Sequence, residues 1–203
     1  MADIDMSRAR SFGQVAEEYD RWRPSYPDAA VHWLAPPPPA RVADGAGTGK
    51  LTSLLLARGL TVEAVEPDPR MLAVLARHNP GARLHESDST SIPVEDRSLD
   101  AVIVADAWHW FDVEPTITEL RRVLKPGGWL GLVWNVVADP VEPWEFELAD
   151  DSDNFDRKTK GSAAGVKQRL SYFPEDELEL AQFAWVWELT RRTTRPTWQP
   201  APC

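Results

Sequence analysis

The sequence predicts an α/β fold, in which a doubly wound, mostly parallel sheet carries helices on both faces. Three observations support this prediction. A glycine-rich turn at residues 42–52 joins an apolar strand to a helix. An acidic residue, Glu66, lies 21 positions after Gly45. Apolar runs of strand length then alternate with helical patterns up to residue 137, as in a parallel sheet. The pattern leaves open whether the C-terminal strands are complete.

The turn itself has glycine at three alternate positions, Gly45, Gly47 and Gly49. Glycines with this spacing let the backbone pass from a strand into a helix while a ligand lies almost against the peptide planes. The helix that follows presents free N–H groups to a polar ligand. The turn therefore predicts a nucleotide-type binding site.

Spacing separates three kinds of glycine-rich nucleotide turn. A phosphate-binding P-loop needs Gly-x-x-x-x-Gly-Lys-Ser/Thr, but Asp44 stands at its first glycine and Leu51 at its hydroxyl position. A dinucleotide fingerprint needs Gly-x-Gly-x-x-Gly, and Lys50 stands at its third glycine. The remaining pattern is Gly-x-Gly-x-Gly preceded by an acid. It resembles the nucleotide loop of class I S-adenosylmethionine (SAM) methyltransferases.

The elements after the turn predict the second half of this site. A helix is expected at residues 51–58, with Gly59 as its C-terminal cap, followed by a strand at residues 61–65. This strand places Glu66 at its carboxyl end, where an acid can accept hydrogen bonds from two ribose hydroxyls. An ordinary strand-end carboxylate is the alternative interpretation of Glu66.

The alternation of strands and helices then continues. The expected elements are a helix at 69–78 with Asp68 as its N-cap, a short strand at 82–86, a polar loop at 87–98, a buried strand at 99–105, a helix at 115–125 ended by residues 126–128, and a strand at 129–137. Ligands of such sheets bind beyond the carboxyl ends of the strands. We therefore expect residues 45–49, 66, 87–88 and 106–110 along one edge.

Composition excludes several functional classes. With 32 acidic and 22 basic residues the net charge is −10, which disfavours a nucleic-acid partner. The single cysteine, Cys203, gives neither a disulfide framework nor a cysteine metal cluster, and no metal site is predicted. No apolar run approaches membrane-spanning length, and residues 1–5 lack the features of a signal peptide. A cytoplasmic protein without a membrane partner is expected.

Five segments in the right order make the resemblance specific. Over about residues 10–145 the sequence resembles SAM-dependent methyltransferases of the type 11 and trans-aconitate methyltransferase-like group. The matching segments are residues 12–27, which resemble the N-terminal lid of that group, 45–52, 65–67, 105–112 and 122–128. The resemblance implies a Rossmann-like enzyme that moves a methyl group from SAM to a small-molecule acceptor.

The same resemblance implies a set of cofactor residues. The glycine loop would hold the methionine end of SAM and Glu66 the ribose. Asp88 and Ser89 would border the adenine, and Tyr19 and Arg23 would close over the cofactor. The full expected set is Tyr19, Arg23, Asp44, Gly45, Ala46, Gly47, Thr48, Gly49, Glu66, Pro67, Met71, Asp88, Ser89, Asp106 and Ala107.

Catalysis of methyl transfer from a sulfonium needs mainly alignment and exclusion of water. A base is needed only if the nucleophile arrives protonated. His109 is the first candidate because imidazole titrates near neutral pH, and Tyr19 and Asp106 follow. A histidine packed between Trp108 and Trp110 is the alternative interpretation.

The expected organisation is an N-terminal helical lid and proline-rich spacer (residues 1–40), a SAM-binding core (41–137) and a divergent C-terminal part of the same domain (138–203). The prolines at 36–39 are interpreted as a stiff spacer between lid and core. The loop departs from the family because Asp44 directly precedes Gly45, where an apolar residue usually separates the two. Either the loop is one residue short, or Asp44 takes the apolar position and Ala43 the acidic one.

The C-terminal region departs from the family as well. Alternating Phe183, Trp185, Trp187 and Leu189 predict a late strand, and no closing elements follow it. A dimer partner could supply a missing edge strand, so a monomer and a homodimer both remain open. The functional alternatives are a degenerate SAM-fold protein without activity and a nicotinamide-dependent oxidoreductase.

Overall fold

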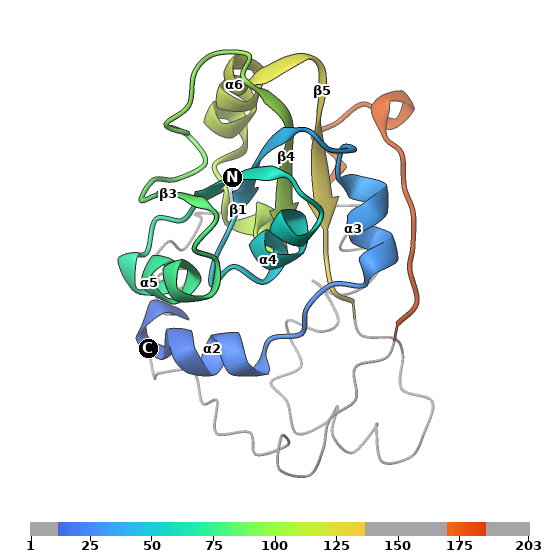
Figure 1. Cartoon of the computed structure of the whole chain (residues 1–203). Coiled ribbons are helices and arrows are strands. Elements are labelled where there is room, and N and C mark those ends of the chain that lie inside the picture. The colour runs from blue at the N-terminus through green and yellow to red at the C-terminus, as the bar shows by residue number, and fades with distance from the viewer. Residues whose placement is uncertain (1–11, 137–169, 186–203) are drawn as a thin grey trace.

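The computed structural model describes residues 12–136 and 170–185. These residues form a sheet of five parallel strands in the order β3-β2-β1-β4-β5 (Figure 1). This order confirms the predicted doubly wound, Rossmann-like sheet, because the chain runs outward from β1 in one direction and then in the other.

The strands are β1 (Arg41–Gly45), β2 (Thr61–Val65), β3 (Arg83–His85), β4 (Leu99–Ala105) and β5 (Leu124–Val133). The helices are η1 (Phe12–Val15), α2 (Ala16–Trp22), α3 (Asp28–Leu34), α4 (Lys50–Ala57), α5 (Pro69–His78), η2 (Trp108–Trp110), α6 (Val113–Val123) and η3 (Glu175–Glu177). None of these helices is long and apolar enough to cross a bilayer.

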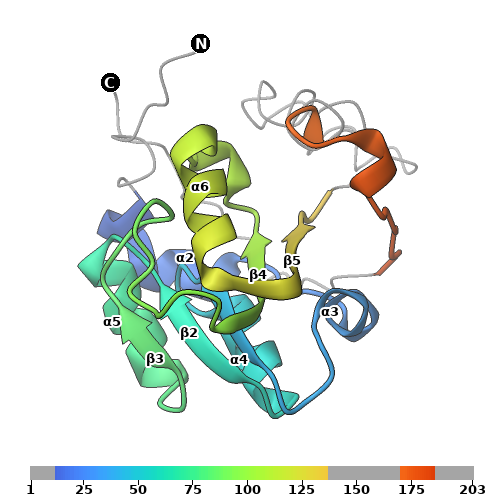
Figure 2. The same cartoon turned by 90° about the horizontal axis from the view of Figure 1, so that it is seen from above.

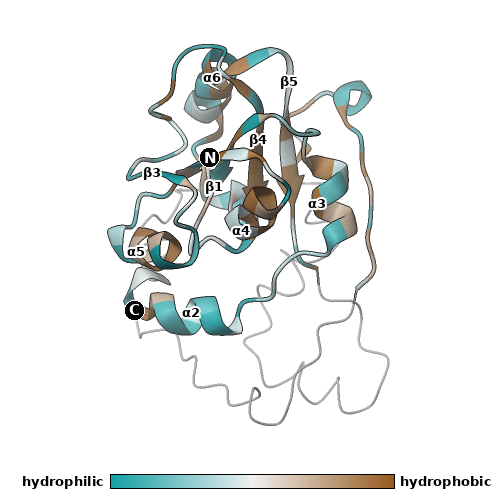
Figure 3. Cartoon of the chain, viewed as in Figure 1, coloured by the Kyte–Doolittle hydropathy of each residue, from teal (hydrophilic) through white to brown (hydrophobic). Residues whose placement is uncertain are grey.

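Helices cover both faces of the sheet (Figure 2). On one face, Val42 and Ile103 of the central strands pack with Leu55 of α4 and with α3, and α5 lies beside α4. On the opposite face, Val102 packs with Leu120 of α6. Figure 3 shows that β4, which lies between two other strands, is hydrophobic. In the same view α2, at the carboxyl edge of the sheet, is mostly hydrophilic. Burial of apolar side chains on two faces is what the apolar strand runs predicted.

Local signals in the sequence act as expected at two helix ends. Asp68 caps α5, and its side chain accepts a hydrogen bond from the backbone N–H of Arg70 at 2.9 Å. Gly59 follows α4 with φ +80°, a left-handed conformation that glycine adopts without steric cost.

The predicted end of α6, the helix expected at residues 115–125, is wrong. The helix ends at Val123, and residues 126–128 lie inside β5 instead of stopping the helix. The strand is bulged there, because Leu99 pairs with Leu124 while Ala101 pairs with Trp129. Pro126 disfavours helical geometry at the residue before it, so the chain extends early and the glycines form the bulge.

The predicted late strand is not formed in the part that the structure describes. Phe183 and Trp185 have no strand conformation, and Trp187 and Leu189 lie outside the described residues, as does the tail at 193–200. The ring of Phe183 instead lies 6.3 Å from that of Trp33 on α3. Alternation alone does not form a strand, because a strand also needs a hydrogen-bonded neighbour.

The prolines at 36–39 do not separate a lid from the core. They connect α3 to β1, and α3 is itself part of the core because Val31 and Leu34 are buried against the sheet. The sequence did not predict α3 as a separate helix. With seven residues, α3 is too short to show a clear helical period.

Candidate functional site

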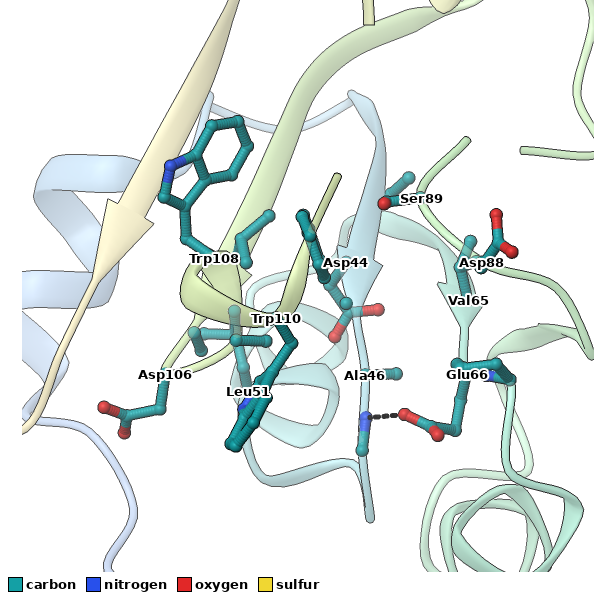
Figure 4. A pocket seen from close by; sticks show the side chains of 18 of the residues that line it. Asp44, Ala46, Leu51, Val65, Glu66, Asp88, Ser89, Asp106, Trp108 and Trp110 are labelled. Atoms are coloured by element: carbon teal, nitrogen blue, oxygen red, sulfur yellow. Dashed lines mark hydrogen bonds between the residues drawn. The ribbon is translucent and has the colours of Figure 1, made fainter. Parts of the chain in front are cut away.

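The carboxyl ends of β1, β2 and β4 border a cavity of about 630 Å³ (Figure 4). Its volume is within the range of small-molecule sites. The cofactor residues predicted from the sequence all line this cavity, with the exception of Gly49, and so does His109. Several lining residues were not predicted from the sequence, among them Thr116 and Leu120 of α6, and Trp134 and Asn135 of the chain after β5. Thr116 and Leu120 are one helical turn apart, and this spacing is the only feature of the sequence that indicates that the two share a helix face. No sequence feature indicated Trp134 or Asn135.

Gly47 and Gly49 of the loop have different roles. Gly47 has φ +54°, and a Cβ atom built on it would meet only Met71 Cε, at 3.9 Å. This glycine therefore keeps cavity space open. Gly49 has φ +93°, and its Cβ would lie 2.3 Å from Asn79 Nδ2. Gly49 is thus required by packing against α5, which explains why it is not on the cavity wall.

Glu66 follows β2 and lies beside the glycine loop (Figure 4). Its carboxylate accepts hydrogen bonds from the backbone N–H of Gly47 at 3.1 Å and of Asp68 at 2.9 Å. Burial raises the pKa of Glu66 to about 7, although these two N–H groups oppose the shift. Each carboxylate oxygen keeps a further lone pair for a ligand hydroxyl, so the ribose assignment stays a prediction.

Asp44 is the residue before the end of β1, and it is buried. β1 continues in regular register, with Gly45 beside Val65 and Val104. The Asp44 side chain lies on the α4 face, where Thr52 Oγ1 donates a hydrogen bond to it at 2.6 Å. Ala43 is on the opposite face, packed in the α6 cluster. Asp44 and Ala43 therefore lie on opposite faces of the sheet, and both sequence alternatives for the loop stay predictions.

Burial of Asp44 has an electrostatic cost. The side chain is 1% exposed, and none of the described residues donates a hydrogen bond to its Oδ1 atom. Burial raises the pKa of Asp44 to about 7, with Thr52 opposing the shift and the nearby charge of Glu66 adding to it. Two carboxylates with raised pKa values in one cavity are typical of a functional site.

We expect Asp44→Asn to stabilise the free protein at pH 8 by on the order of 2 kcal/mol. The folded-state pKa of Asp44 is about 7, well above the ordinary pKa of an aspartate side chain. The folded protein therefore binds the proton more tightly than the unfolded chain, and stability falls as pH rises from about 4 to 7. Asparagine carries no charge and can still accept the Thr52 hydrogen bond.

Urea unfolding of both proteins at pH 5 and pH 8 measures this effect. The difference between them should be about a third as large at pH 5 as at pH 8, because most of the loss develops between pH 5 and 7. Asp112→Asn, at an exposed position, is the control and should retain the wild-type dependence. An unchanged pH dependence in Asp44→Asn would contradict the proposed cost of burying this carboxylate.

The N-terminal helix α2 lies against α5 at the carboxyl edge of the sheet (Figure 1). Ala16 packs on Met71, and Asp20 is 3.4 Å from Lys50 Nζ. Tyr19 and Arg23 from this segment line the cavity, with the guanidinium carbon 5.7 Å from the Tyr19 ring centre. Burial raises the pKa of Tyr19, so its phenol is protonated at neutral pH and is a hydrogen-bond donor, not a base.

The loop after β3 forms another wall of the cavity. Asp88 accepts hydrogen bonds from the backbone N–H and the hydroxyl of Thr90, at 2.9 and 2.6 Å. The Ser89 hydroxyl is 2.8 Å from that of Thr116 on α6. Asp88 and Ser89 thus lie at the cavity as expected, and their place beside an adenine stays a prediction.

The candidate bases lie at the carboxyl end of β4. His109 belongs to η2 and lines the cavity, with its ring 4.7 Å from that of Trp110. Trp108 is buried against Phe111 and Phe173, with ring centres 5.7 and 5.5 Å away. The His109 ring therefore packs beside Trp110 and also lines the cavity, as the packing interpretation and the catalytic interpretation each require.

The arrangement fits a nucleoside cofactor that carries positive charge. Gly47 leaves room beside the backbone, buried carboxylates face the cavity, and aromatic rings form part of its wall. Cations interact favourably with both carboxylates and ring faces. Within the described ranges, no group of three or more His, Cys, Asp or Glu side chains could hold a metal ion.

Comparison with known proteins gives the same assignment. A profile described as "Methyltransferase domain" matches residues 43–132. An uncharacterized methyltransferase of Mycobacterium tuberculosis is 50% identical over 141 residues, which are 69% of this chain and 58% of that protein. The chain thus spans less than two thirds of the length of this relative. The demethylmenaquinone methyltransferase of Thermus thermophilus is 31% identical over 85% of this chain and 89% of its own length.

Solved structures share the fold. A protein of Anaeromyxobacter dehalogenans, described as a type II methyltransferase, superposes with a TM-score of 0.64 at 27% identity, covering 78% of this chain and 70% of the other. A protein of Thermotoga maritima, described as a SAM-dependent methyltransferase, has a TM-score of 0.54 at 24% identity, with 79% and 77% covered.

Proposed function

Because this chain belongs to the SAM-dependent methyltransferases, we propose that it transfers a methyl group from SAM to a small-molecule acceptor. SAM is the cofactor of this family. The observation that carries the proposal is the meeting of three features at one cavity. These are the backbone of Gly45 and Gly47 on the cavity wall, the Glu66 carboxylate that accepts a hydrogen bond from Gly47, and the lid residues Tyr19 and Arg23.

The residues of the cavity suggest how the cofactor would be held. The backbone at Gly45 and Gly47 would receive the amino-acid end, and Glu66 would accept hydrogen bonds from the ribose. Residues 88 and 89 would border the base. Asp44 and Glu66 would become fully ionised when a cation enters, since a nearby positive charge lowers the pKa of a carboxyl group.

When bound, SAM supplies a methyl group that is already activated by a positive sulfur with a neutral leaving group. The protein is then required to align the acceptor and to exclude water. Tyr19 and Arg23 cover the cavity at the lid, and Trp108 and Trp110 form an aromatic wall near the end of β4. These residues provide a dry and shaped environment.

His109 would act as the base for an acceptor that arrives protonated. It lies on the cavity wall beside Trp110, at the carboxyl end of β4. A neutral imidazole nitrogen can accept a proton from a hydroxyl or an ammonium group at neutral pH. Asp106 is a weaker candidate, because its carboxylate already accepts hydrogen bonds from lid residues.

A small molecule is the acceptor class that the observations support. The cavity is concave and partly aromatic, and its 630 Å³ must hold the cofactor as well. A net charge of −10 disfavours nucleic acid.

Titration calorimetry with SAM and S-adenosylhomocysteine tests cofactor binding. We expect binding of both, and no binding of NAD, since the family match favours a methyltransferase over the alternative of a nicotinamide-dependent oxidoreductase. Transfer of labelled methyl to a panel of carboxylic acids, phenols and amines then tests activity. Binding without transfer to any of them would favour the degenerate SAM-fold alternative, and failure to bind SAM would overturn the proposal.

A further inference from the structure

The carboxylate of Asp106 lies where the N-terminal segment meets the ends of β4 and β5. Its Oδ2 atom accepts a hydrogen bond from Tyr26 Oη at 3.0 Å. The same atom forms an ion pair with Arg23 Nη2 at 3.1 Å. Its Oδ1 atom accepts a hydrogen bond from the backbone N–H of Asn135 at 3.2 Å. Asn135 Nδ2 in turn donates to the carbonyl of Ser25 at 3.1 Å. One side chain thus joins three separate segments of the chain.

The orientation of this carboxylate differs from that expected of a cofactor ligand. In Figure 4 it points away from the other labelled side chains of the cavity, although its residue lines the wall. The Asp106 side chain is 9% exposed and Tyr26 is 8% exposed, so the hydrogen bond between them is shielded from water, whereas the Arg23 side chain is 38% exposed. Shielded hydrogen bonds to a charged group are stronger than exposed ones.

The backbone of Asp106 is also unusual. Its φ is +52°, a left-handed conformation that non-glycine residues rarely adopt and that asparagine and aspartate tolerate best. Its N–H donates to the carbonyl of Val133, which fixes the residue to the end of β5. Strained residues of this kind persist where the surrounding structure holds them, often at functional sites.

The segment that Asp106 holds connects the lid to the core. Tyr26 is 8% exposed and packs in the core cluster with Val31 and Leu34 of α3. On its other side, Arg23 directly follows α2, where Tyr19 lines the cavity. The position of Arg23 therefore determines where the end of α2 lies relative to the cavity.

We propose that Asp106 is a positioning residue that fixes the lid over the cavity through Arg23 and Tyr26, and does not itself bind the cofactor. This proposal rests on the proposed function, since it assigns the lid a role in cofactor retention. It changes the role of Asp106 from the cofactor contact that the sequence predicted to an anchor between the lid and the sheet edge.

Three variants of the full-length chain separate the contributions. Asp106→Gly removes the side chain and relieves the left-handed strain, so any loss comes from the missing carboxylate. Asp106→Asn keeps an acceptor for Asn135 and a donor toward Tyr26 Oη but removes the charge. Tyr26→Phe removes a single hydroxyl and keeps the packing of the ring. Glu114→Gln removes a charge from an exposed position on α6 and is the control.

Hydrogen exchange of the free proteins tests the anchor directly. In Asp106→Gly, exchange over residues 19–26 should accelerate about tenfold, while exchange in β1 and β4 stays unchanged. Asp106→Asn and Tyr26→Phe should show smaller accelerations, about threefold. The control should match the wild type. Unchanged exchange over residues 19–26 in both Asp106→Gly and Tyr26→Phe would overturn the proposal.

Binding of S-adenosylhomocysteine distinguishes an anchor from a cofactor contact. We expect its Kd to rise about tenfold in Asp106→Gly and in proportion to the exchange rate across the series. Weaker binding with unchanged exchange would show a direct contact and would overturn the positioning role. If the wild type does not bind the probe, the proposed function fails, while the exchange experiment still decides whether Asp106 anchors the segment.

Discussion

Replacement of Glu66 by alanine is expected to weaken SAM binding by about 2–4 kcal/mol, which is roughly a 30- to 1,000-fold rise in Kd. Two charge-assisted hydrogen bonds to the ribose would be lost. The variant also leaves the backbone N–H groups of Gly47 and Asp68 without their acceptor, so the glycine loop itself becomes less fixed. The loss of the ribose hydrogen bonds and the less fixed glycine loop both weaken the binding of SAM.

Calorimetry of wild type, Glu66→Ala and Glu66→Gln separates these effects. The glutamine variant can still accept one backbone hydrogen bond, so its loss should be smaller than that of alanine. Glu86→Ala, at an exposed position near the end of β3, is the control and should bind as the wild type does. Unchanged SAM affinity in Glu66→Ala would make the ribose assignment wrong.

Gly49→Ala is expected to lower the free energy of unfolding by about 2–5 kcal/mol. Its φ of +93° is costly for any residue with a Cβ atom. That atom would also lie 2.3 Å from Asn79 Nδ2 and 3.0 Å from Leu75 Cγ, so these two buried side chains would have to shift. The strain and the overlap add, because a shift of the Asn79 amide leaves the contact with Leu75 and the backbone strain in place.

Gly47→Ala is the matched variant in the same loop. It shares the left-handed conformation, but its Cβ would be 3.9 Å from its nearest neighbour, Met71 Cε. Its stability loss should therefore be only about 1 kcal/mol, while SAM affinity should fall about tenfold or more because the methyl group enters the cavity. Urea unfolding and calorimetry on both variants measure the contrast. Equal stability losses would contradict the division of roles between the two glycines.

The sequence by itself determined the sheet, the strand-to-helix turn and the family. Buried parallel strands need near-continuous apolar runs, so β2 and β4 have the predicted bounds at 61–65 and 99–105. Capping is similarly local, and Asp68 therefore predicted the start of α5 correctly. The spacing of the glycines and Glu66 located the cavity, because the carboxyl ends of parallel strands meet at one edge.

Only the tertiary structure decided which way particular side chains face. The sequence did not indicate which face of the sheet the Asp44 side chain occupies, and the folded structure places it against Thr52 of α4. Gly49 belonged to the same motif as Gly47 but serves packing, since the position of Asn79 depends on how α5 lies against α4. Asp106 pairs with Arg23 and Tyr26 across about 80 residues of sequence. No local pattern encodes such a pair, because it forms only when the folded sheet brings the N-terminal segment to the ends of β4 and β5.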